Sequence, residues 1–78
     1  MSGLDLVEYI VENLVDQPEQ VQLTEIPGSE ETVIEVRVAD SDIGKIIGKN
    51  GSVARSLRTL LSAAGTHEEK NYTLEIID

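Results

Sequence analysis

The residues best suited to chemistry lie in one short stretch, Ile43-Gly44-Lys45-Ile46-Ile47-Gly48-Lys49-Asn50-Gly51. Glycine lets an anion approach the backbone closely, and the N-terminus of a following helix presents unpaired N–H groups and a positive dipole end. Lys49 adds a mobile positive charge, and Asn50 supplies donors while tolerating left-handed torsions. The stretch therefore predicts a site for a phosphate or a similar anion.

Charge is distributed unevenly along the chain. The formal net charge is −9, yet the window 43–67 holds four basic residues and neither Asp nor Glu. The rest of the chain carries all 15 acidic residues and two basic ones, Arg37 and Lys70. An acidic chain repels polyanions overall, so this segregation predicts anion contact at one face of the protein.

Periodicity predicts the elements that precede this stretch. Apolar residues at helical spacing indicate a helix over 4–15, and Asp5 suits its N-terminus. Alternating residues indicate strands over 20–27 and 32–38, joined as an antiparallel hairpin through a Pro27-Gly28-Ser29 turn.

The second half of the chain predicts two helices and a strand. We expect a short helix over 42–47, a longer one over 52–64 that ends at Gly65, and a last strand over 71–77. The order α-β-β-α-α-β makes the second and third strands parallel neighbours with a right-handed crossover, and it puts the helices on one face. The 78 residues suffice for a single domain, 1–78.

The central stretch resembles the I-G-x-x-I-G-x-x-G signature of KH domains, and the element order is that of their type II variant. The resemblance covers the whole chain, which is similar to the bacterial KhpA family. It implies an α+β fold with a three-stranded mixed sheet, and a loop that clamps about four backbone nucleotides of single-stranded RNA. It further implies a role as an RNA chaperone or post-transcriptional regulator, a second KH protein, KhpB, as partner, and a capacity for homodimerisation.

The candidate RNA-binding residues combine this loop with its surroundings: Arg37, Ile43, Gly44, Lys45, Ile47, Gly48, Lys49, Asn50, Gly51, Val53 and Arg55. The apolar members would form a floor for the bases, and of Ile46 and Ile47 we expect one to pack into the core. Arg55 follows the loop by one helical turn and can reach a phosphate. Arg37 would border the groove or pair with a carboxylate, whereas Arg58 is expected to be solvated.

Other classes of site find less support. The chain has no cysteine, and its one histidine, His67, is expected in a surface turn, so neither a metal site nor a cofactor is predicted. The sixth position of a Walker A loop starting at Gly44 would be Lys49 instead of glycine, and G-x-G-x-x-G is absent. No nucleophile accompanies a base, so we do not expect an enzyme.

Neither a membrane span nor an export signal is visible, which predicts a cytoplasmic protein that does not associate with membranes. The alternative hypothesis is a protein-interaction module on the same fold, with RNA binding secondary. The strongly acidic remainder of the chain favours it, whereas the basic Lys49 between the two glycines favours RNA.

Overall fold

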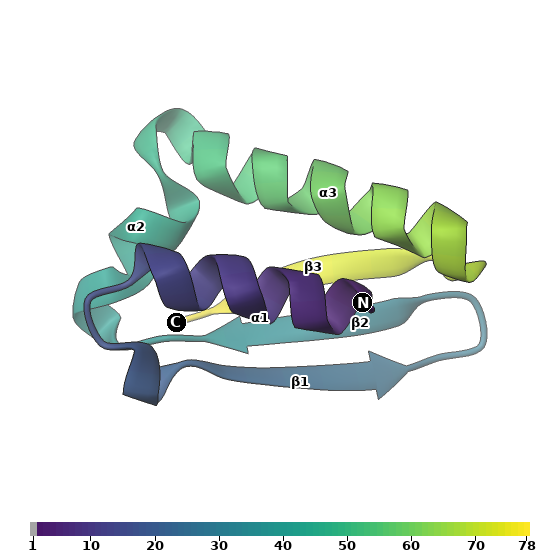
Figure 1. Cartoon of the computed structure of the whole chain (residues 1–78), viewed down its shortest axis with the longest axis horizontal. Helices are drawn as coiled ribbons and strands as arrows, with labels where there is room; N and C mark the ends of the chain where they lie inside the picture. Colours follow the sequence, from purple (N-terminus) through teal and green to yellow (C-terminus); the bar gives the residue numbers. More distant parts are fainter. Residues whose placement is uncertain (1) are drawn as a thin grey trace.

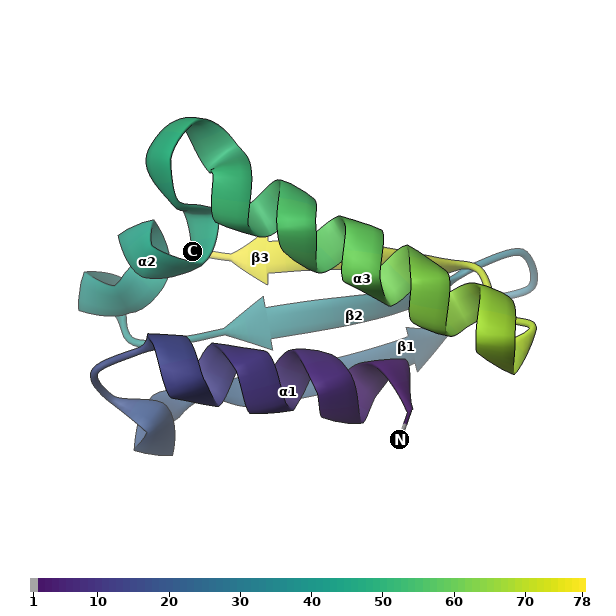
Figure 2. The same ribbon diagram turned by 45° about the horizontal axis from the view of Figure 1, so that its top comes forward.

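The computed structural model describes residues 2–78. Its helices and strands are α1 (Gly3–Leu14), β1 (Gln22–Pro27), β2 (Thr32–Arg37), α2 (Ile43–Ile47), α3 (Ser52–Glu68) and β3 (Tyr72–Ile77). The strands form one sheet in the order β1-β2-β3, in which β1 is antiparallel and β3 parallel to β2. All three helices cover one face of this sheet (Figures 1 and 2). The predicted α+β fold with a mixed sheet and a helical crossover is confirmed.

The core lies between the helices and the covered face of the sheet. β2 is the central strand, and its residues Ile34 and Val36 are completely buried because they alternate toward the helices. Every helix and two of the strands contribute to the buried apolar cluster: Val7, Val11, Val15, Ile34, Val36, Ile46, Leu57, Leu61 and Leu74. Within residues 2–78, no helix is both long and apolar enough to cross a membrane.

The N-terminal elements begin and end close to their predicted bounds. α1 starts one residue earlier than expected because Ser2 and Asp5 form a capping box: the Ser2 hydroxyl accepts from the Asp5 N–H at 3.1 Å, and the Ser2 N–H donates to the Asp5 carboxylate at 3.4 Å. β1 starts at Gln22 instead of residue 20, because Pro18–Gln20 forms a turn of 3₁₀ helix.

The C-terminal end of α3 differs from the prediction. The helix runs to Glu68, so the expected end at Gly65 is wrong, and His67 lies in the last helical turn instead of a loop. The chain leaves the helix at Glu69, whose φ of 59° and ψ of 39° are left-handed. Gly65 does not end the helix. It is a glycine because the Lys70 carbonyl and the Tyr72 ring lie too close for a side chain.

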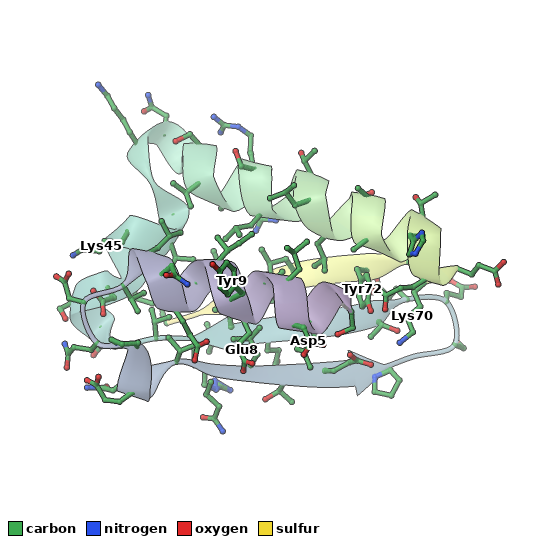
Figure 3. The ribbon with its side chains drawn as sticks, viewed as in Figure 1. Asp5, Glu8, Tyr9, Lys45, Lys70 and Tyr72 are labelled. Atoms are coloured by element: carbon green, nitrogen blue, oxygen red, sulfur yellow. The ribbon has the colours of Figure 1, made fainter. Side chains whose placement is uncertain are left out.

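That packing joins α1, α3 and β3 at one end of the molecule. A Cβ atom added to Gly65 would lie 3.1 Å from the Tyr72 ring, and one added to Gly3 would meet the same ring at 2.7 Å. The Glu68 carboxylate accepts hydrogen bonds from the Gly3 N–H at 2.8 Å and from the Tyr72 hydroxyl at 3.0 Å. Burial and the bond to Glu68 raise the pKa of the Tyr72 phenol. Figure 3 shows Tyr72 and Lys70 at this end.

Candidate nucleic-acid interface

The Gly48–Gly51 loop joins α2 to α3 at the opposite end of the molecule from the β1–β2 hairpin (Figure 1). Gly48 has φ 76° and ψ 174°, a conformation almost restricted to glycine, and Gly51 is left-handed with φ 75°. Between them Asn50 has φ 56° and ψ 28°, which asparagine tolerates better than most residues. Three positive φ angles within four residues explain why the stretch needs glycine and asparagine.

The loop holds its shape through short-range bonds while leaving donors free. The Gly48 N–H donates to the carbonyl of Gly44 at 2.9 Å, and the Gly51 N–H donates to the carbonyl of Gly48 at 3.1 Å. The backbone N–H groups of Lys49 and Asn50 donate to no acceptor outside the turn within residues 2–78, and both side chains are exposed. Free N–H groups beside a mobile ammonium group are what an anion site requires.

Arg55 braces this loop. Its Nη1 donates to the Asn50 carbonyl at 2.6 Å, and the bare Cα of Gly51 makes room, since a Cβ there would lie 3.3 Å from Nη1. A guanidinium group has five N–H donors, so this bond leaves others facing solvent next to the loop. The geometry thus adds a bracing role to the predicted phosphate contact of Arg55.

Lys45 has carboxylate partners. Its Nζ lies 3.2 Å from Oδ2 of Asp16 and 3.6 Å from Oδ1 of Asp42, and the hydrogen bond and charge of Asp16 raise the pKa of the lysine. Figure 3 shows Lys45 on α2, below the loop. The geometry therefore favours a structural role for Lys45 over the predicted phosphate contact.

The apolar candidates divide between core and surface. Ile46 has no exposed surface, whereas residue Ile47 is 40 % exposed, which matches the expectation that one of the two packs inside. Ile43 and Val53 are half-buried, and Gly44 is exposed with open space around its Cα. Ile47 is therefore the apolar side chain beside the loop that is most accessible to a base.

Arg37 does not lie with the loop. It follows buried Val36 on β2, so it points to the face of the sheet opposite the helices, where its Cα partners are Gln22 and Ile77. No carboxylate of residues 2–78 lies within ion-pair distance of it. The structure therefore does not bring Arg37 to the groove, nor does it give it the carboxylate partner that was the alternative.

The positive charge near the loop remains uncompensated. Within the described chain, Lys49, Arg55 and Arg58 have no carboxylate within 4.0 Å. A shallow hollow continues along the outer face of α3 and is lined by Ser52, Arg55, Ser56, Thr59 and Leu60. Sequence reasoning missed this hollow because hydroxyl-bearing helix residues carry no motif.

Asp42 is the second feature that sequence analysis missed. Sequence analysis placed it inside the short helix without a role, yet its side chain is fully buried directly before α2. The available signal was its position, since Asp42 is the last acid before a window of 25 residues, 43–67, that has none.

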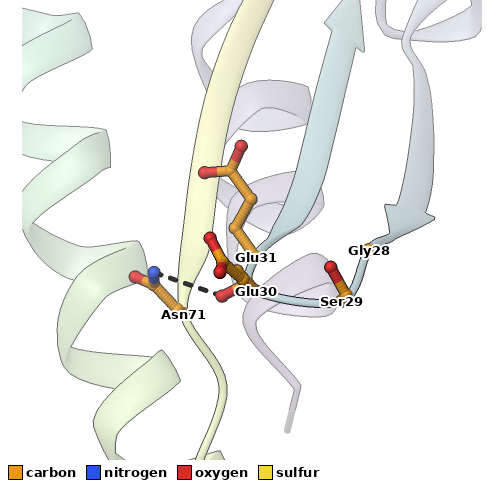
Figure 4. Close-up of a pocket in the computed structure, with 5 residues that line it drawn as sticks. All are labelled: Gly28, Ser29, Glu30, Glu31 and Asn71. Carbon is orange, nitrogen blue, oxygen red and sulfur yellow. Dashed lines mark hydrogen bonds between the residues drawn. The ribbon is translucent and has the colours of Figure 1, made fainter.

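The other end of the molecule has the opposite chemistry. A polar hollow there is lined by Gly28, Ser29, Glu30, Glu31 and Asn71, and the Asn71 amide donates to the Glu30 carbonyl at 3.4 Å (Figure 4). Its two side-chain carboxylates make it unsuitable for a polyanion. Among residues 2–78, no group of three or more His, Cys, Asp or Glu side chains is arranged to hold a metal ion.

Comparison with known proteins agrees with this geometry. The KhpA/KhpB KH-domain profile matches residues 4–76. The chain is 49 % identical over 74 residues to RNA-binding protein KhpA of Treponema pallidum, covering 95 % of this chain and 92 % of that protein. It is 47 % identical over 79 residues to RNA-binding protein KhpA of Aquifex aeolicus, covering both chains completely. For the Borreliella burgdorferi protein of the same name, identity is 45 % over 75 residues, with 96 % and 92 % covered. No solved structure matches significantly.

Proposed function

Because the chain belongs to the KhpA/KhpB family of KH domains, we propose that it binds single-stranded RNA by gripping the nucleotide backbone with the Gly48–Gly51 loop. The observation that carries the proposal is the loop itself. Lys49 and two free backbone N–H groups face solvent between glycines, in a part of the chain without acids. Such an arrangement complements phosphate, and Ile47 offers an apolar surface for a base.

The protein acts in this proposal as a binding module without chemistry of its own. Residues 1–78 work as one domain in the cytoplasm, as an RNA chaperone or post-transcriptional regulator. A single loop contacts few phosphates, so one copy binds weakly and tight action depends on a second RNA-binding unit. A KhpB-type KH protein fits that role, and so does a second copy of this chain.

The test is a titration of mixed-sequence single-stranded RNA with the parent and with K49D/N50D, followed by fluorescence anisotropy at several salt concentrations. With about three phosphate contacts, the parent should show a slope of log K against log[salt] near −2. Two carboxylates in the loop replace a charge-assisted hydrogen bond worth about 1.5–3 kcal/mol by repulsion, so affinity should fall at least about tenfold. Both positions are exposed, so the circular dichroism spectrum should not change.

A matched control separates the loop from net charge. R37E/Q20E changes the formal charge by the same amount as K49D/N50D, at two exposed positions away from the loop. Its affinity should stay within about twofold of the parent, because charges farther away than a Debye length are screened. Full binding by folded K49D/N50D would transfer the proposal to the alternative, a protein-interaction module. Equal losses in both variants would mean that net charge, and not the loop, governs RNA affinity.

The second copy has a candidate surface on α3. Ser56, Thr59, Leu60 and Ala63 are exposed on its outer face, where Leu60 is 44 % exposed. Because residues 43–67 contain no acid, two chains can meet there while their carboxylates stay outside the contact. We expect L60E to shift sedimentation toward a single 8.5 kDa species. A parent that sediments as a monomer at high micromolar concentration would exclude this homodimer.

A further inference from the structure

Asp42 is a fully buried carboxylate, and it connects two segments that are distant in sequence. Its Oδ1 accepts from the Asp16 N–H and its Oδ2 from the Gln17 N–H, both at 3.1 Å. Those N–H groups lie just beyond the last turn of α1, where the chain turns toward β1. A buried carboxylate is costly unless it is hydrogen-bonded, so these contacts define where Asp42 can sit.

Side chains around Asp42 reinforce the connection. Lys45, on α2, contacts Asp16 and Asp42, and the Gln17 amide donates to the Ser41 hydroxyl at 3.0 Å. We call the set Asp16, Gln17, Ser41, Asp42 and Lys45 the Asp42 network. The network connects the segment that follows α1 to the start of α2 through hydrogen bonds and ion pairs.

α2 depends on outside contacts for its position. It has five residues, which is far too short to be stable alone, and no side chain caps its N-terminus. Its completely buried apolar side chain is Ile46, whereas Ile47 is 40 % exposed. The Asp42 network lies at the start of α2, and the Gly48–Gly51 loop follows directly from its end.

We propose that Asp42 is a positioning residue for RNA binding: it holds α2, and with it the Gly48–Gly51 loop, in the anion-binding arrangement without touching RNA. The exposed loop residues Lys49 and Asn50 have no packing of their own, so their placement follows from α2 on one side and α3 on the other. This inference rests on the proposed RNA-binding function. It adds that the α1–β1 connection controls how often the loop is ready to bind.

The proposal has a distinctive salt signature. If loss of the network lets α2 move, the loop is competent for a smaller fraction of the time, and the apparent dissociation constant rises by the inverse of that fraction. The bound state keeps all its phosphate contacts, so the salt slope does not change. Loss of a direct contact would instead reduce the slope by about 0.7.

The experiment compares D42N and K45Q with the parent at a temperature where circular dichroism shows all of them folded. Asparagine keeps the size of aspartate but loses one acceptor and the charge, and K45Q keeps most of the lysine stem. We expect about fivefold weaker RNA binding at every salt concentration with an unchanged slope. Without RNA, amide hydrogen exchange at Gly51 and Ser52 should quicken in D42N, because the open fraction rises.

Y72F is the control, since it also removes a hydrogen bond to a carboxylate, at the far end of the molecule. It should change neither loop exchange nor affinity. Unchanged affinity and loop exchange in folded D42N and K45Q would overturn the proposal, and a reduced slope in K45Q would make Lys45 a direct RNA ligand. If D42N does not fold, K45Q decides alone. A parent that does not bind RNA refutes the proposed function, whereas loop exchange still tests the positioning.

Discussion

The two ends of the molecule carry short turns of opposite chemistry. At one end, Lys49 and Asn50 project from a turn between two helices, and residues 43–67 contain no acid. At the other end, the hairpin turn presents Glu30 and Glu31, and Glu69 follows α3. The long axis measures 33 Å, several times the Debye length of about 8 Å at physiological salt. An anion at the loop therefore meets positive groups first, and the net charge of −9 is a poor guide to binding there.

The two turns also differ in how the backbone is held. The loop end contains three residues with positive φ that lie between a five-residue helix and α3, so its shape depends on glycine and on its neighbours. The hairpin end continues a regular sheet register from Pro27 paired with Thr32. The shape of the basic end therefore depends more on glycine, and is more easily disrupted by substitution, than that of the hairpin end.

The largest effect is expected from G48A, with G44A as the matched control in the same motif. An added Cβ at Gly48 would lie 2.8 Å from Cβ of Val53, and the backbone there is nearly restricted to glycine. The free energy of unfolding should fall by about 1–3 kcal/mol, with loss of RNA binding. Gly44 is helical with open space around it, so G44A should gain about 0.5–1 kcal/mol. Urea denaturation measures both free energies of unfolding. A G48A variant as stable as the parent would contradict the requirement for glycine at this position.

Equal and opposite charge changes at the two ends test the electrostatic contrast. K49E should weaken RNA binding by about tenfold, because it replaces attraction at the phosphate by repulsion. E30K makes a change of the same size at the hairpin and should strengthen binding by less than about twofold at physiological salt. Anisotropy titrations measure both effects, and similar magnitudes would mean that the overall charge governs affinity.

A smaller effect should appear in the pH dependence of the Asp42 network. The N–H of Asp16, with that of Gln17 and the charge of Lys45, lowers the pKa of Asp42 below its usual 3.8 despite its burial. A carboxyl with a lowered pKa stabilises the fold above its unfolded pKa and loses that contribution as the pH falls through the folded one. The stability difference between parent and D42N should be constant from pH 7 to about 5 and shrink toward pH 3 in urea denaturation. A constant difference would contradict an ionised Asp42.

The smallest effect is expected at the acidic end, from E69G. Glu69 is left-handed, so glycine should raise the free energy of unfolding by about 0.5–1 kcal/mol. RNA affinity should stay within about twofold, because the site is far from the loop. E68G, one residue earlier, is the control and should destabilise the fold, since Glu68 is helical and accepts bonds from Gly3 and Tyr72. Thermal unfolding measures the stability of both variants. An E69G variant no more stable than the parent would contradict backbone strain at Glu69.

Sequence patterns predicted the fold because each pattern reports a local requirement. Alternation identified β2 with its buried Ile34 and Val36, and two helices between strands required a parallel neighbour. The loop could be located from the sequence because Gly48 and Asn50 are residue types that accept positive φ angles. This requirement is local and depends little on tertiary contacts.

The parts that could not be predicted depend on distant partners. Lys45 looked like a free cation, but its partner Asp16 lies on the other side of the first two strands in the sequence. Gly65 looked like a helix end because its close contacts, with the Lys70 carbonyl and the Tyr72 ring, form only after the chain turns back from α3 toward β3. Arg37 was assigned to the RNA-binding site because it lies near the end of β2. Alternation with buried Val36 instead directs it to the face of the sheet opposite the helices.

The parallel ladder between β2 and β3 has a consequence for how the protein is made. It pairs Thr32 with Tyr72 and Arg37 with Ile77, residues separated by the whole crossover that contains the loop. Contacts between such distant residues form slowly, whereas the β1–β2 hairpin can close early. On the ribosome, β3 also emerges last of all the elements. We therefore expect a nascent chain to present the loop before β3 fixes α3, and to acquire RNA-binding competence only after the final strand has left the exit tunnel.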